Sequence, residues 1–164
     1  MRISYILSVA VLALAPLPAF ADEGHGHGRQ PMHYDGHAAA MGMPGDAKAR
    51  GIRTVNVVMG DDMRFKPAQI SIAKGQTVRF VVKNNGELKH EFVLGTETEL
   101  SEHAAVMEKF PEMEHDDPNA VSVEPGKTAE FLWTFAKPGT WNVGFGCLIP
   151  GHYDAGMKGK ISVR

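Results

Sequence analysis

Short β-type segments separated by turn residues fill the chain from residue 51 to residue 164, and this pattern limits the fold more than any other feature. Such segments occupy 52–59, 68–84, 90–95, 120–135, 139–147 and 157–164. The pairs Lys74-Gly75 and Pro125-Gly126 are turn signals that divide two of them into successive strands. Seven or eight short strands in about 114 residues are typical of a β-sandwich, so we expect an all-β fold.

One segment within this region has a helical period instead. Leu100, Ala104 and Met107 share one face of a helix predicted over 98–110. Thr98 can cap its amino-terminal end, and Pro111 cannot continue it. We therefore expect one short helical insertion in a folded domain of residues 51–164.

The first 21 residues have the pattern of a secretory signal. Arg2 precedes an apolar run over 3–15, and Ala19-Phe20-Ala21 fits the small-x-small cleavage pattern. The run is short for a membrane span, and Pro16 and Pro18 follow it, so we expect cleavage rather than anchoring. The predicted location is the bacterial periplasm, with no membrane span after signal cleavage.

Residues 22–50 are rich in Gly, His, Met and Ala and have no apolar period, so we predict a disordered tail. Imidazole and thioether groups are ligands for copper. The tail is either a weak, adjustable metal-binding segment or a flexible leader with chance histidines. Its candidate ligands are His25, His27, Met32, His33, His37, Met41 and Met43.

The single cysteine, Cys147, has no partner for a disulfide within the chain. In an oxidising compartment a lone thiol is buried, reactive, paired with another molecule, or held by a metal. The net charge of −2 gives no indication of nucleic-acid binding.

Cys147 begins the stretch "CLIPGHYDAGM", which also contains His152 and Met157. Thiolate, imidazole and thioether form a soft donor set that suits copper better than magnesium, calcium or zinc, and a blue-copper site adds a second histidine. Among the four histidines of the predicted domain we favour His90, which lies at the start of a predicted strand. Each residue alone has a plainer interpretation: a small core cysteine, a turn histidine, a core methionine.

These residues give the domain a resemblance to the cupredoxins, the small blue-copper proteins. "FKPAQISIAKGQTVRFVVKNNGELKHEF" resembles their amino-terminal half, and "GTWNVGFGCLIPGHYDAGMKGKISV" resembles their ligand loop. The Cys-x4-His-x4-Met spacing is similar to that of rusticyanin and auracyanin. The resemblance implies a Greek-key β-sandwich with one type 1 copper near one end. It also implies that His90, Cys147 and His152 are the strong ligands and that Met157 is the axial one.

Within that family the chain resembles periplasmic cupredoxins linked to bacterial copper tolerance. The segments "HEFVLG" and "MEHDDPNAV" and the His- and Met-rich amino-terminal stretch carry this likeness. The surplus of soft side chains suggests an auxiliary Cu(I) site, although Met59 is also explained as a core residue of a strand. The candidates for this site are Met59, Met63, Met113 and His115.

The predicted function is a periplasmic type 1 copper protein that cycles between Cu(II) and Cu(I) and contributes to copper handling and tolerance. Its expected partners are copper ions and a periplasmic redox protein, a copper exporter or an oxidase, and a monomer is the default state. The alternative is a diffusible one-electron carrier that docks through Leu148, Ile149 and Pro150 beside His152. A copper-independent structural β-domain is a third interpretation. The folded domain has no His-x-His pair, so four-electron oxidase chemistry is not expected, whereas Cu(I) oxidation stays open.

Overall fold

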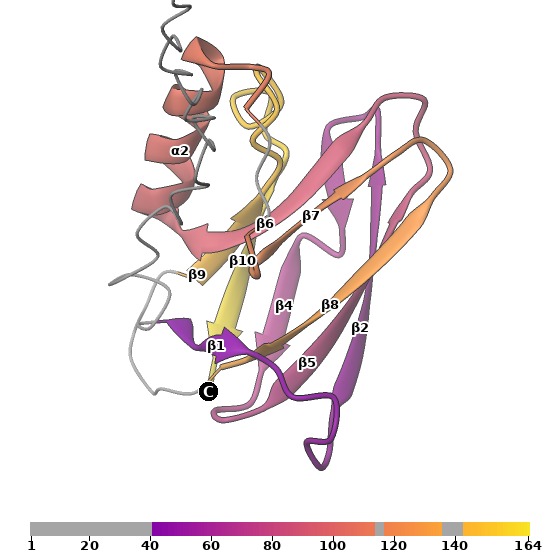
Figure 1. Ribbon diagram of the computed structural model, residues 1–164, viewed down its shortest axis with the longest axis vertical. Coiled ribbons are helices and arrows are strands. Elements are labelled where there is room, and N and C mark those ends of the chain that lie inside the picture. Colours follow the sequence, from indigo (N-terminus) through magenta and orange to yellow (C-terminus); the bar gives the residue numbers. More distant parts are fainter. Residues whose placement is uncertain (1–40, 114–116, 136–142) are drawn as a thin grey trace, which may run out of the picture. The chain divides into compact units, whose positions relative to one another are not determined.

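The structure is a computed structural model that describes residues 41–113, 117–135 and 143–164. The predicted signal and most of the predicted tail lie outside these residues. The described part contains two sheets of five strands each and one helix of 13 residues (Figure 1).

The first sheet has the strand order β1-β8-β5-β2-β3. Its central strands alternate in burial, so that one face of each strand points into the core and the other toward solvent. β2 and β5 pair in parallel, with Val55 opposite Phe80. The strands of this sheet are β1 (Met43–Pro44), β2 (Arg53–Gly60), β3 (Arg64–Lys66), β5 (Thr77–Asn84) and β8 (Thr128–Thr134).

The second sheet has the strand order β4-β10-β9-β6-β7. β9 pairs antiparallel with both β6 and β10, and all four of its residues are buried. The strands of this sheet are β4 (Gln69–Ile72), β6 (His90–Thr96), β7 (Ala120–Val123), β9 (Val143–Gly146) and β10 (Lys158–Val163).

Aromatic side chains from both sheets meet in the core. The ring of Phe92 on β6 lies 4.9 Å from that of Phe145 on β9, 5.2 Å from Phe80 on β5 and 5.6 Å from Phe65 on β3, measured between centroids. Phe80 and Phe65 belong to the first sheet and Phe92 and Phe145 to the second, so these contacts join the two layers. The predicted β-sandwich is therefore confirmed.

The predicted helix is α2 (Glu97–Lys109), which lies against β6 and β9 of the second sheet (Figure 1). Its amino-terminal cap is Thr96, and the prediction of Thr98 for this role is wrong. Thr96 and Glu99 form a reciprocal capping box: the Glu99 N–H donates to Thr96 Oγ1, and the Thr96 N–H donates to Glu99 Oε2. The helix ends at Lys109, one residue before the Phe110 cap and two before Pro111. Within the described residues no helix is long and apolar enough to cross a membrane.

The folded domain begins earlier than predicted. β1 pairs antiparallel with β8, with Met43 opposite Thr134. Met41 lies in the main core with 4% of its surface exposed. Residues 41–50 thus belong to the fold, whereas the sequence analysis placed them in a disordered tail. A two-residue strand next to one buried methionine has no apolar period that would reveal it.

Candidate metal centre

Strand pairing brings His90 and Cys147 to the same end of the second sheet. β6 runs antiparallel to β9, with Val93 opposite Gly146. His90 is the first residue of β6, and Cys147 follows directly after β9. The start of one strand therefore lies beside the end of the other, and both side chains are fully buried there.

Residues 147–157, the ligand loop, connect β9 to β10. The loop is closed at its base, where the Cys147 N–H donates to the Met157 carbonyl at 3.0 Å. The Met157 N–H donates in turn to the His152 carbonyl, also at 3.0 Å. Gly156 has a φ of +97°, which favours glycine and turns the chain back toward β10.

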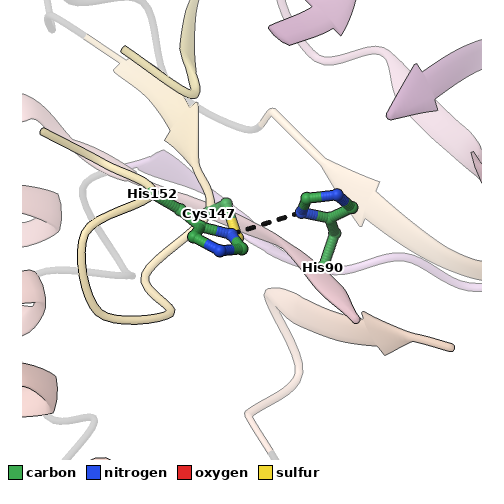
Figure 2. A group of neighbouring side chains, drawn as sticks. All are labelled: His90, Cys147 and His152. Carbon is green, nitrogen blue, oxygen red and sulfur yellow. Dashed lines mark hydrogen bonds between the residues drawn. The ribbon is translucent and has the colours of Figure 1, made fainter. Parts of the chain in front are cut away.

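Three of the predicted ligands converge (Figure 2). His152 Nδ1 lies 3.3 Å from Cys147 Sγ and 3.3 Å from His90 Nδ1. The ligand atoms of His90, Cys147 and His152 all lie within 4.8 Å of one another. We call these three residues the candidate metal centre. Two imidazoles and a thiolate form a soft donor set that fits copper.

Met157 is also fully buried, in the same core cluster as Cys147. Its backbone is hydrogen-bonded to both loop ligands, as described above. Its role as the weak axial ligand stays a prediction.

Burial sets the protonation of the centre. Desolvation raises the pKa of the Cys147 thiol to about 11, partly offset by the Glu91 N–H, which donates to Sγ at 3.3 Å. Desolvation also lowers the pKa of the half-buried His152, and the nearby His90 lowers it further. The thiol of the metal-free protein is therefore protonated at neutral pH, while His152 has a neutral ring that is ready to bind a metal.

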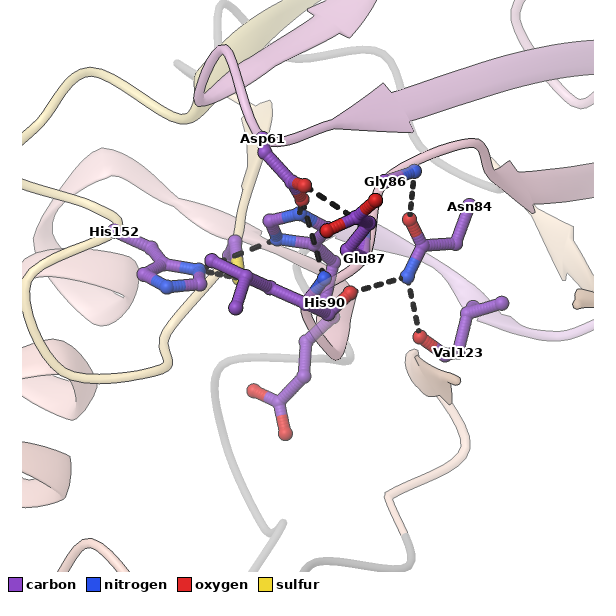
Figure 3. A network of polar contacts seen from close by, with 10 residues as sticks. Asp61, Asn84, Gly86, Glu87, His90, Val123 and His152 are labelled. Atoms are coloured by element: carbon purple, nitrogen blue, oxygen red, sulfur yellow. Dashed lines mark hydrogen bonds and ion pairs between the residues drawn. The ribbon is translucent and has the colours of Figure 1, made fainter. Parts of the chain in front are cut away.

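An acidic residue that the sequence analysis did not identify holds the other side of His90. Asp61 Oδ1 lies 3.1 Å from His90 Nε2 (Figure 3). The same carboxylate accepts hydrogen bonds from the N–H groups of Glu87 at 2.7 Å and Leu88 at 3.3 Å. The hydrogen bond from Glu87 holds the pKa of Asp61 below its ordinary value, with smaller contributions from His90 and Leu88.

A buried amide organises residues 85–89, the loop that leads into His90. Asn84 Nδ2 donates to the carbonyls of Leu88 at 2.7 Å and Val123 at 2.9 Å, and Asn84 Oδ1 accepts from the Gly86 N–H at 2.8 Å (Figure 3). Because these bonds satisfy the buried side chain, Asn84 costs little to bury and fixes the loop against β7.

Two further groups support the ligand loop. Arg64 Nη1 donates to the Ala155 carbonyl at 2.8 Å and to the Met63 carbonyl at 2.7 Å. On the other side, Leu148 and Tyr153 pack in one cluster with residues of α2. The helical insertion thus supports the loop that carries three of the predicted ligands.

Leu148 is 1% exposed, so the predicted docking patch is wrong for this residue. Its side chain packs in the cluster that contains Leu100 and Met107 of α2 instead of facing solvent. Ile149 is half-buried and Pro150 is exposed.

The auxiliary Cu(I) candidates within the described residues belong to two different clusters. Met59 is a fully buried residue of β2, as its alternative interpretation predicted. Met63 packs against the main core, whereas Met113 packs against the second cluster beside α2. His115 lies outside the described residues.

Of the predicted tail ligands, Met41 packs in the main core and Met43 is 55% exposed on β1. The others lie outside the described residues: His25, His27, Met32, His33 and His37.

Comparison with known proteins identifies copper-binding relatives. The sequence model of a family described as copper binding proteins, plastocyanin/azurin family, matches residues 52–164. The chain is 49% identical over 166 aligned residues to the copper-resistant cuproprotein CopI of Rubrivivax gelatinosus, covering 97% of this chain and 98% of that protein. A protein with the same name from Pseudomonas aeruginosa is 41% identical, over 78% of this chain and 84% of its own length.

A solved structure agrees with the fold. The auracyanin of the photosynthetic bacterium Roseiflexus castenholzii, in its dithionite-reduced form, aligns with a TM-score of 0.58 at 23% identity. The alignment covers 68% of this chain and 96% of that one. At this identity the likeness concerns the fold alone.

Proposed function

Because the chain belongs to the plastocyanin/azurin family of copper-binding proteins, we propose that it is a type 1 copper protein that cycles between Cu(II) and Cu(I). His90, Cys147 and His152 would hold the metal, and Met157 would be its weak axial ligand. The observation that carries this proposal is the convergence of two imidazoles and one thiol within 4.8 Å.

The residues around the candidate metal centre suit a copper ion that cycles between Cu(II) and Cu(I). Copper bound to a thiolate supplies one-electron chemistry and an intense visible absorption. The residues around the site limit movement: strands fix His90 and Cys147, and backbone bonds close the ligand loop. A preformed site reduces the rearrangement that accompanies each change of oxidation state.

The physiological role that we propose is copper handling and tolerance in the periplasm. The relatives named copper-resistant cuproprotein support this role, and the signal-like residues 1–21 support export. The predicted tail ligands before position 41, together with the auxiliary candidates Met63, Met113 and His115, would bind further Cu(I).

One observation favours a second candidate, a diffusible electron carrier. His152 is partly exposed, and Pro150 next to it on the loop is exposed. An electron partner could therefore approach the copper through this ligand. The two candidates share the same copper chemistry and differ in how much Cu(I) the protein binds.

Copper titration of the signal-free protein tests both points. We expect one equivalent of Cu(II) to produce a strong visible thiolate-to-copper band, and Cys147→Ser to abolish it. A copper-loaded but colourless wild-type protein would refute the type 1 assignment. Competition with a Cu(I) chelator then separates the roles: Cu(I) bound beyond one equivalent supports copper handling, and a single copper supports the carrier.

A further inference from the structure

We propose that Asp61 is a positioning residue of the copper site: its carboxylate fixes the ring of His90 with Nδ1 toward Cys147 and His152, and it stabilises Cu(II) over Cu(I). The inference rests on the proposed function, since it requires His90 to bind copper.

The hydrogen bond between Asp61 and His90 determines which ring nitrogen carries the proton. An ionised carboxylate only accepts hydrogen bonds, so the contact of 3.1 Å requires a proton on His90 Nε2. The lone pair of the neutral ring is then on Nδ1, the nitrogen that lies 3.3 Å from His152 Nδ1. The ring is fully buried, and its two nitrogens have separate polar contacts: Nε2 with Asp61 and Nδ1 with His152.

Asp61 is itself held in place. It lies in the turn of residues 61–63 between β2 and β3, and its carboxylate is bonded to the N–H groups of Glu87 and Leu88 just before His90. Gly86 makes this approach possible, since a Cβ at that position would lie 2.0 Å from Asp61 Oδ1. The carboxylate is therefore tied to the same loop that delivers His90 to the metal.

The negative charge has an electronic consequence. A carboxylate that accepts the outer N–H of a metal-bound histidine increases the basicity of that ligand. A more basic imidazole favours the higher oxidation state, so Asp61 should lower the reduction potential of the copper.

Three variants separate charge from position. Asp61→Asn removes the charge but keeps the size and an accepting oxygen. Asp62→Asn is the matched control, because it removes the charge of the neighbouring residue. The Asp62 carboxylate accepts a hydrogen bond from Lys66 Nζ at 2.6 Å. Gly86→Ala keeps the charge of Asp61 but forces its carboxylate to move.

Two readouts report on the role directly. Redox titration of the visible band gives the reduction potential. Nitrogen-15 NMR of the diamagnetic Cu(I) form reports on the His90 Nε2–H, which we expect to exchange slowly with solvent in the wild type. We expect Asp61→Asn and Gly86→Ala to raise the potential and speed this exchange. Asp62→Asn should change the potential by a smaller amount and leave the exchange rate as it is.

Equal potential shifts in Asp61→Asn and Asp62→Asn, with an unchanged His90 proton, would show a general charge effect and overturn the inference. An unchanged potential and proton in Gly86→Ala would do so independently, even if Asp61→Asn failed to fold. A wild-type protein that binds copper without a visible band would overturn the proposed function and this inference together. If the wild-type copper protein has the visible band but the variants give either of the first two results, the inference about Asp61 fails and the proposed function stands.

Discussion

Cys147 and His90 are ionisable residues that the fold buries completely. Burial disfavours the thiolate form of Cys147, which is why the pKa of this thiol rises to about 11. A metal ion reverses this preference, because it binds the thiolate and replaces the proton. The burial that makes Cys147 unreactive in the metal-free protein therefore keeps it available for copper.

Copper affinity should depend on pH through this thiol. Below a pKa of about 11, binding must displace the thiol proton, so the apparent affinity should rise about tenfold per pH unit from this group alone. The pKa of His152 is lowered, so this ring adds little to the slope at neutral pH and above. Chelator competition between about pH 7 and 9 measures the slope. Cys147→Ser should reduce it by one proton, and an equal slope in both proteins would contradict the prediction.

At the scale of residues, the sequence predicted ligands more readily than their supports. Cys147, His152 and Met157 lie in one short loop, so their spacing carries a recognisable pattern. Asp61 contacts His90 across 29 positions, and Asn84 contacts Val123 across 39. Such contacts depend on how strands pair, and a lone Asp or Asn in a turn has no local pattern that indicates its distant partner.

The elements around the site act as supports for its loops. Arg64, the first residue of β3, joins that strand to the ligand loop through the Ala155 carbonyl. From the other side, α2 packs against Leu148 and Tyr153 of the same loop. A loop held on two sides has few alternative conformations, so little conformational freedom is lost when a metal binds.

Removing one support should loosen the loop. We expect Arg64→Ala to lower the free energy of unfolding of the metal-free protein by about 1 kcal/mol, the typical contribution of one hydrogen bond. It should also speed copper release to a chelator. Arg79→Ala is the matched control, because Arg79 pairs with the exposed Glu130 on β8. Similar release rates in the two variants would show that Arg64 does not support the loop.

The first strand gives a second test at this scale. Met41→Ala should lower the free energy of unfolding by about 2–5 kcal/mol, because it leaves a cavity in the core. Met43→Ala, two residues away and 55% exposed, should have an effect within about 0.5 kcal/mol of zero. Chemical denaturation measures both. Equal effects would mean that Met41 is not a core residue in solution.

Element prediction succeeded where the pattern was long and failed where it was short. The eight-residue strands β2 and β5 have buried residues at alternate positions, and the helical face of Leu100 and Met107 is buried as expected. β1 and β3 have two and three residues, too few to show a period. The helix begins earlier than predicted because Thr96, rather than Thr98, caps it. Thr96 forms a reciprocal capping box with Glu99, which stabilises this start of the helix.

For the whole molecule, the family relationship predicted from the sequence is confirmed, and the folded domain is larger than expected. The family match covers residues 52–164, and β1 adds a segment before it. This extension matters for any experiment that removes the amino-terminal region, because a cut at residue 50 would also remove part of the core.

Two truncations distinguish metal capture from folding. Deleting residues 22–40 should lower the total copper stoichiometry but leave the visible band and the thermal stability unchanged. Deleting 22–50 should lower the melting temperature in addition, since it removes the buried Met41 and β1. Copper analysis and thermal scans of both proteins test this. An unchanged stoichiometry after the shorter deletion would remove the proposed role of the tail.

β10 separates the candidate metal centre from Arg164. The strand begins at Lys158, directly after Met157, and its six residues span roughly 20 Å. Backbone bonds then fix Arg164 to Ile72 and Lys74, at the end of β10 away from the ligand loop (Figure 1). A linker attached at Arg164 would therefore anchor the protein to an electrode or a bead with His152 facing the solution. Immobilised in this way, the protein could exchange electrons with dissolved partners. Its candidate metal centre, however, would lie at the end of the domain away from the supporting surface.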